Sequence, residues 1–542
     1  MPETKFEPGA GEPDAGEELT AQRAKQGMPP LQPATSRDRG AGPFGRMVLR
    51  GATVIDGTGA PPIGPIDIVV EKGRIAELRK VGVPKAPINP DRRPPAGDHE
   101  IDCGGKFVTP GFIDCHAHAG VPYHAVHGWV PPVDYVYKLW LAHGVTTVRE
   151  MGSFNGLGWM LEQRALSEAN AIAAPRLLAY AYIPVVNDML KTIHTPEQAR
   201  AWLGRVKQRG ADGIKFFGAP PALMQAALDE CRKLGLRSGC HHAQMAVTRM
   251  NALTSATWGL SSAEHYYGLP EALFDDRIVQ AYPTDYDYSD EYFRFAYAGQ
   301  TFAQAAPPGS AKWSEVLEKF LALDFTFVPT FSIYDANRDL MRARQADWHH
   351  EYAWKSMWDF FQPGRGAHGS YWFRWSTTNE IEWKQNYRLW MQFINEYKNR
   401  GGRVCTGSDS GFIFQLFGFG YIRELELLQE AGFHPLEVVR AATSQGADLL
   451  GIGDDTGSIE VGKAADLLVH EHNPLTDFKL LYGTGAMRLN DETRRVEWHR
   501  GLRYTIKGGV VYDVAELLAD VRALVEKSYA EAPDARPGAR LT

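Results

Sequence analysis

Six side chains of the kinds that bind metal ions lie at the ends of short apolar runs along the chain. Two of them, His116 and His118, form a His-x-His pair, and the other four follow at Lys215, His242, His265 and Asp409. Residues i and i+2 of a strand point to the same face, so the His-x-His pair can grip one ion. Strand ends that converge on one mouth are the way a (β/α)8 barrel builds an active site. The order and spacing of the set therefore predict a hydrolytic metal centre.

The middle of the chain alternates strand-like and helical segments, which is typical of a parallel sheet. One expected helix begins with a capping box at Thr195 and ends at Gly210. Eight strands are predicted, at 112–116, 145–149, 176–181, 213–217, 237–242, 261–265, 325–330 and 403–409. All six ligand-type residues fall at or just beyond the carboxyl ends of these strands. The predicted fold class is α/β, a (β/α)8 TIM barrel.

Short strands separated by Gly and Pro turns occur near both chain ends, and they predict one β-sandwich built from both termini beside the barrel. The predicted division of the chain is an N-terminal arm (1–45), a first part of the sandwich (46–110), the catalytic barrel (111–450), a second part of the sandwich (451–515) and a C-terminal helix with a tail (516–542). The arm is polar and rich in Gly, Pro and Ala, so we expect it to be disordered or loosely wrapped.

The composition excludes several classes of partner. The 542 residues carry a net charge of −7 without a clustered basic face, which argues against nucleic-acid binding. No stretch reaches the roughly 20 apolar residues of a membrane span, and no secretory signal is readable. The 5 cysteines are odd in number and form no C-x-x-C pair, which favours a reducing compartment. A cytoplasmic protein is predicted.

Each candidate ligand also has an ordinary structural role to set beside metal binding. Adjacent His241 and His242 cannot both face inward on a regular strand, and His242 is the one we predict as the ligand. Lys215 would ordinarily be a surface lysine, but it lies between Ile214 and Phe216 on an apolar strand. In a closed core it must lose its charge, and between two cations it could do so by taking up CO2 as a bridging carbamate. Asp409 could instead be a turn or N-cap residue.

Several longer motifs resemble the amidohydrolase superfamily of metal-dependent hydrolases, in particular its imidazolonepropionase-like and Xaa-Pro or Xaa-Arg dipeptidase-like branch. The resemblance extends from about Val48 to Asp513. It rests on segments 51–59 (GATVIDGTG), 108–114 (VTPGFID), 144–149 (GVTTVR), 431–437 (AGFHPLE), 441–443 (AAT) and 457–467 (GSIEVGKAADL). Together these motifs are specific for a family, but not for a substrate.

The resemblance implies a binuclear centre. By it, His116, His118 and Asp409 would hold the more buried metal, and His242 with His265 would hold the second. Lys215 would be carboxylated and bridge the two divalent ions, most often zinc, with a hydroxide between them. Asp409 would act as the proton shuttle, first general base and then general acid. Family members with one metal place other residues on the strand of the lysine.

The leading functional hypothesis is hydrolysis of a carbon–nitrogen bond in a small-molecule amide, such as an N-acyl amino acid, a dipeptide or an aryl amide. A second hypothesis keeps the metal centre but acts on a lactone or other ester, or deaminates. Deamination normally goes with one metal and no bridging lysine, so Lys215 counts against it. The third hypothesis is a non-catalytic oligomeric scaffold, and the filled ligand positions count against that.

Two segments are longer than barrel connections need to be, at about 266–323 and 331–400. Both are rich in aromatic residues, which indicates local core, a lid over the active site or a contact in a homo-oligomer. Arg149, Tyr266 and Tyr267 are candidates for orienting the substrate. Arg149 could equally be a structural ion-pair partner.

Overall fold

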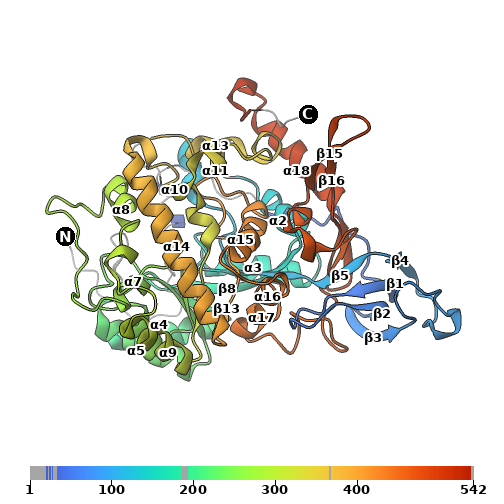
Figure 1. Cartoon of the computed structure of the whole chain (residues 1–542), viewed down its shortest axis with the longest axis horizontal. Helices are drawn as coiled ribbons and strands as arrows, with labels where there is room; N and C mark the ends of the chain where they lie inside the picture. The colour runs from blue at the N-terminus through green and yellow to red at the C-terminus, as the bar shows by residue number, and fades with distance from the viewer. Residues whose placement is uncertain are drawn as a thin grey trace.

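A computed structural model of the chain describes residues 20–21, 24–25, 27, 33–184, 193–364 and 368–538. One of its two main sheets is parallel, and helices pack around it (Figure 1). The strands follow one another in chain order, β6 to β13, and each is parallel to its neighbours. Sequential parallel strands joined through helices are the pattern of repeated β-α units. The fold is therefore mixed α/β.

All eight predicted strands are present among the described residues. Their bounds are β6 (Phe112–Ala117), β7 (Val145–Glu150), β8 (Arg176–Tyr182), β9 (Gly213–Phe216), β10 (Arg237–His241), β11 (Ser262–Glu264), β12 (Thr326–Val328) and β13 (Arg403–Val404). The last five are shorter than predicted. Beyond β13 the backbone meets the first strand again, because Cys115 N–H donates to the Thr406 carbonyl at 2.9 Å and Asp409 N–H to the His116 carbonyl at 2.7 Å.

Helices follow the strands of this sheet. The predicted helix after Thr195 is α4 (Pro196–Arg209), which begins at the capping box of Thr195 and Gln198 and is capped at its C-terminus by Gly210 in the left-handed conformation at φ 103°. The other helices outside the two long insertions are α2 (Val133–Ala142), α3 (Leu157–Glu168), α5 (Pro221–Lys233), α6 (Ala252–Thr257), α15 (Phe419–Glu430), α16 (Pro435–Ala441), α17 (Ser444–Leu450) and α18 (Val514–Ser528). None of the described helices has the length and apolar composition needed to cross a bilayer.

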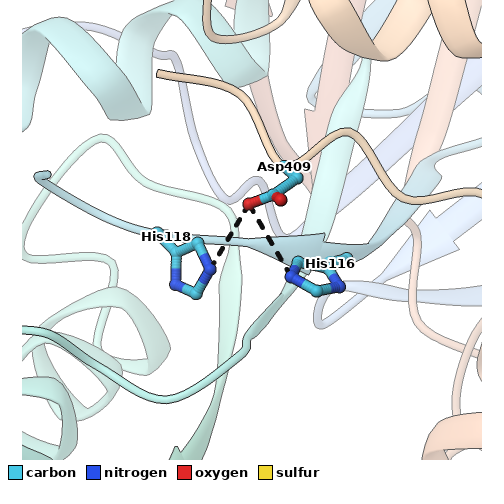
Figure 2. Close-up of side chains that lie close together, drawn as sticks. All are labelled: His116, His118 and Asp409. Carbon is cyan, nitrogen blue, oxygen red and sulfur yellow. Dashed lines mark ion pairs between the residues drawn. The ribbon is translucent and has the colours of Figure 1, made fainter. Parts of the chain in front are cut away.

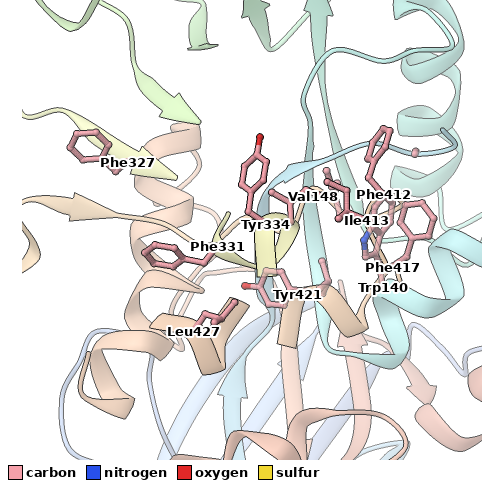
Figure 3. Close-up of a cluster of buried hydrophobic side chains, with 14 of the residues drawn as sticks. Trp140, Val148, Phe327, Phe331, Tyr334, Phe412, Ile413, Phe417, Tyr421 and Leu427 are labelled. Carbon is pink, nitrogen blue, oxygen red and sulfur yellow. The ribbon is translucent and has the colours of Figure 1, made fainter. Parts of the chain in front are cut away.

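The two long insertions are helical. The first contains α7 (Leu269–Ala272), α8 (Glu291–Ala298) and α9 (Ala311–Ala322), and the second α10 (Asp335–Arg338), α11 (Leu340–Arg344), α12 (His349–Tyr352), α13 (Lys355–Phe360) and α14 (Thr377–Asn399). The long α14, drawn in orange, runs across the face of the molecule that is turned to the viewer in Figure 1. Its Trp383 and Trp390 are fully buried, and Trp390 packs on Phe331 with ring centroids 4.4 Å apart. Many of the insertion aromatics are thus core, continuous with the cluster in Figure 3.

Strands from both chain ends share a second sheet. Its order is β18-β17-β14-β5-β1-β2-β3, and β4 pairs with β1. The bounds are β1 (Arg46–Val54), β2 (Ile63–Glu71), β3 (Arg74–Lys80), β4 (His99–Asp102), β5 (Phe107–Pro110), β14 (Leu467–His470), β17 (Leu502–Lys507) and β18 (Val510–Asp513). The antiparallel pairing of β5 with β14 joins the two ends of the chain. A two-layer sandwich stays a prediction, since these strands are connected in one ladder.

Two smaller features lie beside this sheet. Strands β15 (Ala486–Asn490) and β16 (Arg495–His499) form a separate hairpin. The N-terminal arm is described continuously from residue 33, where it contacts the folded body: Thr35 Oγ1 donates to Asp134 at 2.7 Å, and Arg39 pairs with Asp520 at 2.7 Å. Most of the predicted arm before residue 33 lies outside the described residues.

One buried carboxylate, that of Asp466, links the two sheets. It accepts hydrogen bonds from Gly508 N–H at 2.8 Å, Thr456 Oγ1 at 2.8 Å and Arg176 Nη2 at 3.1 Å. Arg176 is the first residue of β8, whereas Gly508 lies between β17 and β18. The carboxylate therefore ties the parallel sheet to the terminal sheet.

We predict that Asp466→Asn lowers the free energy of unfolding by about 2–4 kcal/mol, because an amide must turn an N–H group toward a buried donor and leaves Arg176 less well paired. The matched control is Asp324→Asn. Asp324 also pairs with an arginine, Arg403 at 2.9 Å, but its side chain is 81% exposed, so its loss should cost less than about 1 kcal/mol. Denaturant unfolding of both variants measures the difference, and equal midpoints would show that Asp466 is not a structural tie.

Candidate metal centre

A cavity of about 370 Å³ opens at the carboxyl ends of the parallel strands. Its wall includes His116, His118, Lys215, His265 and Asp409, five of the six predicted ligands. These residues come from β6, β9 and the segments just after β6, β11 and β13. The parallel strands thus bring together residues almost 300 positions apart in the sequence, as their shared direction predicts.

The tightest group in this wall is formed by His116, His118 and Asp409 (Figure 2). Asp409 Oδ1 lies 3.7 Å from His116 Nε2 and 3.4 Å from His118 Nε2. Metal–ligand bonds of about 2.0–2.2 Å at tetrahedral angles place donor atoms about 3.3–3.6 Å apart. The three donor atoms therefore fit around a small divalent ion, and two imidazoles with a carboxylate are ligands that zinc accepts.

A buried carboxylate fixes the orientation of His116. Glu264 Oε2 accepts from His116 Nδ1 at 2.8 Å, so the tautomer that donates there leaves the Nε2 lone pair facing Asp409. Arg149 Nη2 in turn donates to both oxygens of Glu264, at 2.9 and 3.0 Å. Burial, with the nearby charge of Lys215, holds the pKa of His116 well below its usual range. A neutral imidazole is the form that binds metal.

The position of Asp409 depends on Asp114. The Asp114 carboxylate accepts from Ser408 N–H at 2.9 Å and from Ser408 Oγ at 2.6 Å. This holds the turn in which Asp409 adopts φ 48°, a left-handed conformation that aspartate tolerates better than most residues. The Asp409 side chain is 13% exposed, whereas those of His116 and His118 are 1% and 4% exposed. Asp409 is therefore the member of the group that most faces the open cavity.

Lys215 and His265 complete the inner wall. Lys215 Nζ lies 3.4 Å from His116 Nε2, and burial lowers the pKa of the ammonium to about 8. His265 Nε2 lies 3.6 Å from Asp409 Oδ2, and its Nδ1 is hydrogen bonded to Thr330 Oγ1 at 2.5 Å. The ring nitrogen of His265 that faces the cavity is thus fixed by the bond that the other nitrogen makes.

The structure places His241 in the cavity wall, whereas the prediction chose His242. His241 lines the cavity, and its ring centroid lies 4.7 Å from that of His265. His242 is not part of the lining, and its Nε2 is hydrogen bonded to Ser255 Oγ at 2.7 Å. The reason is the register of β10, in which Gly239 pairs with Lys215 and His241 with Glu264. Paired residues of adjacent strands point to the same side, so His241 shares the face of Lys215.

None of the three predicted substrate-orienting residues lines the cavity. Arg149 is fully buried beneath it and contacts Glu264, Ser262 and the Cys115 carbonyl, which makes it the structural ion-pair partner. Tyr266 donates its hydroxyl hydrogen to the Ala298 carbonyl at 2.9 Å. Tyr267 lies behind His241, with ring centroids 5.3 Å apart.

Glu264 and Asp114 were not predicted as functional residues. A signal for each is present in the sequence, because Asp114 precedes His116 by two positions and so shares its face of the strand, and Glu264 directly precedes His265. Their roles depend on pairings between distant strands, which the sequence does not specify.

Comparisons with known proteins agree with this fold. A model of the Amidohydrolase family matches residues 390–488. An imidazolonepropionase from Bradyrhizobium sp. is 28% identical over 264 residues, which cover 40% of this chain and 63% of that protein. The chain thus spans less than two thirds of the length of this curated relative.

Solved structures of amidohydrolases share the fold. Bottromycin amidohydrolase matches with a TM-score of 0.60 at 19% identity, over 98% of each chain. A Xaa-Pro dipeptidase with bound methionine in the active site matches with a TM-score of 0.57 at 16% identity, over 86% of this chain and 100% of that one. The fold and the site place this chain in the class of proteins whose parallel sheet carries metal-ligand-type residues at the ends of its strands. Within that class, the chain is similar to amidohydrolases over residues 390–488 by the family model and over most of its length by fold.

We predict that His241→Asn weakens zinc binding by about 10-fold or more, because a side chain in the wall of the cavity is lost. The adjacent variant His242→Asn should keep the metal content of the parent protein and lose only about 1–3 kcal/mol of stability with the bond to Ser255. Elemental mass spectrometry after dialysis against a weak chelator compares the two. Metal loss in His242→Asn alone would restore the assignment made from the sequence.

Proposed function

We propose that this chain is a metal-dependent hydrolase that cleaves a carbon–nitrogen bond, an amide, in a small molecule. The observation that carries the proposal is the donor set of His116, His118 and Asp409, with Glu264 orienting His116. We also propose that the parallel sheet closes as a (β/α)8 barrel, which the backbone bonds between β6 and the segment after β13 support. Cytoplasmic location and homo-oligomeric assembly remain predictions.

We propose that the site holds two divalent ions, for which zinc is the leading candidate. His116, His118 and Asp409 would hold one ion, and His241 with His265 would hold the other. Lys215 would bridge them as a carbamate. Carbamate forms on a neutral amine, and with a pKa of about 8 roughly one tenth of the lysine is neutral at pH 7, far more than for an exposed lysine. Its Nζ lies 3.4 Å from His116 Nε2, at the edge of the first ligand group.

Bound divalent ions would polarise the substrate carbonyl and lower the pKa of the attacking water. Asp409 would take the proton from that water and deliver it to the leaving nitrogen, which makes one carboxylate both general base and general acid. Its contacts suit this role, because Oδ1 faces His116 and His118 while Oδ2 faces His265. Burial raises the pKa of this carboxyl to about 8, and the charge of Lys215 opposes that rise.

Two other functions use the same residues. Hydrolysis of a lactone or other ester would need the same groups, since only the leaving atom differs. Deamination is less well supported, because Lys215 is buried beside His116 as a bridge would be. A non-catalytic scaffold would have no need to bury and orient six ligand-type side chains in one cavity.

We predict that Asp409→Asn keeps the fold and lowers kcat for amide hydrolysis by about 10²–10⁴-fold, because an amide cannot carry the proton. The test measures hydrolysis of N-acyl amino acids and dipeptides by the zinc-loaded protein, with circular dichroism to check folding. Asp324→Asn, at an exposed aspartate outside the cavity, is the control and should retain full activity. Near-normal rates in Asp409→Asn would exclude the proton shuttle.

We predict that Lys215→Ala lowers the metal-to-protein ratio from near two to near one, and that millimolar acetate or propionate partly restores metal and activity by replacing the carbamate. Lys507→Ala is the matched control. Lys507 is also buried with a pKa lowered to about 8, but its Nζ donates to the Ser167 carbonyl, outside the cavity wall. Unchanged metal content in Lys215→Ala would show that the lysine is not a bridge.

A further inference from the structure

The outer part of the cavity is built by the first insertion. Four residues of the segment around α8 line it, namely Tyr288, Glu291, Arg294 and Phe295. His368, from the second insertion, lines the same region. The only guanidinium in the cavity wall, as far as the structure describes it, is that of Arg294. Arg294 therefore faces the same cavity as His116, His118 and Asp409, the cavity in which a substrate would lie.

The Arg294 guanidinium is held by aromatic rings rather than by a counter-ion. It lies over the ring of Tyr288 at 4.7 Å and over that of Phe295 at 5.2 Å. Across the described residues, no carboxylate comes within 4 Å of it, and Arg294 Nε is buried without a hydrogen-bond partner. Stacking fixes the plane of the guanidinium, and its N–H donors stay available to an incoming group.

The nearest carboxylate on the same helix is engaged elsewhere. Glu291 precedes Arg294 by three residues on α8, and its Oε1 accepts from His368 Nδ1 at 2.7 Å. This bond ties the first insertion to the second across the cavity. The charge of Arg294 is therefore only partly offset by the protein.

Arg294 lies near the proposed reaction site, because it lines the same cavity as His241, His265 and Asp409. A mostly buried cation without a paired anion is costly, and a bound carboxylate would supply two acceptors in the fork geometry of a guanidinium.

Another part of the cavity wall is aromatic. Tyr123 lies at its centre, with ring centroids 6.1 Å from Phe154, 6.4 Å from Phe360 and 6.1 Å from Phe412. Such a wall accepts an apolar or aromatic side chain by burying its surface. The cavity thus offers an ion-binding end, a cationic end and an apolar side.

We propose that Arg294 binds a free carboxylate of the substrate, so that the enzyme acts on acidic amides, N-acyl amino acids or dipeptides with an apolar side chain, and discriminates against neutral aryl amides. This inference rests on the proposed hydrolase function. It makes Arg294 a specificity-determining residue supplied by the insertion after β11.

The test compares N-acetyl-L-phenylalanine, N-acetyl-L-leucine and N-acetyl-L-proline with the same compounds capped as carboxamides. We expect kcat/KM of the parent enzyme to favour the acids by about 30-fold or more. Arg294→Met should remove this preference by lowering kcat/KM for the acids while leaving the carboxamides within about 3-fold, and Arg294→Lys should recover part of it, because a point charge replaces the fork. The matched control is Arg374→Met, since Arg374 also lies over a tyrosine ring, that of Tyr292 at 5.5 Å, but is exposed and outside the cavity wall.

Binding separates this inference from the proposed hydrolysis. Calorimetry on Asp409→Asn, with and without Arg294→Met, measures affinity for the acids and the carboxamides without turnover. Binding of the acids that depends on Arg294 supports the inference even where no amide is cleaved, in which case only the hydrolase function fails. Equal affinity for acids and carboxamides, or no binding of any acid, overturns the role of Arg294 even where amides are hydrolysed.

Discussion

The buried ion pair between Arg149 and Glu264 is the interaction on which the candidate site depends. Both side chains have no exposed surface, and the Glu264 carboxylate also accepts from Ser262 Oγ at 2.6 Å and from His116 Nδ1 at 2.8 Å. A buried pair of this kind adds little net stability, but loss of one partner leaves an unpaired charge and costs about 3–5 kcal/mol. The pair therefore fixes one arrangement of β6, β7 and β11, and with it the direction of the His116 imidazole. The geometry of the ligand group therefore depends on the ion pair of Arg149 and Glu264 beneath it.

Local backbone strain is concentrated in the same place. His265, Thr330 and Asp409 all have left-handed backbone conformations, at φ 63°, 49° and 48°, and all follow the ends of strands of the parallel sheet. Such conformations cost about 1–3 kcal/mol for residues other than glycine and persist only where the surroundings hold them. Here the surroundings are specific: Thr330 Oγ1 bonds His265 Nδ1, and the Asp409 N–H donates to the His116 carbonyl. The stability of the sheet thus offsets the backbone strain at these three residues.

Strand positions, and the gathering of five of the six candidate ligands in one cavity, could be predicted from the sequence, because alternating apolar runs mark parallel strands and the chemistry of such folds lies at their carboxyl ends. The choice between His241 and His242 could not, because it depends on the register of β10 against β9 and β11. One residue of difference in where a strand ends moves a side chain to the other face. Arg149 shows the same limit, since its pairing with Glu264 joins residues 115 positions apart. The aromatic insertions were ambiguous because residue type does not separate core from lining: Trp390, Phe295 and Phe360 are all buried, but only Phe295 and Phe360 line the cavity.

The arrangement of charge in the cavity also constrains how an acidic amide could bind. The inner end holds Asp409, with the carboxylates of Asp114 and Glu264 behind it, and all three disfavour another anion in the absence of bound cations. The outer end holds the partly compensated cation of Arg294. With its carboxylate on Arg294 at α8, a substrate has its scissile carbonyl directed toward the histidines. Reversal would leave Arg294 unpaired, so the cation that attracts the substrate also orients the bond that Asp409 must reach.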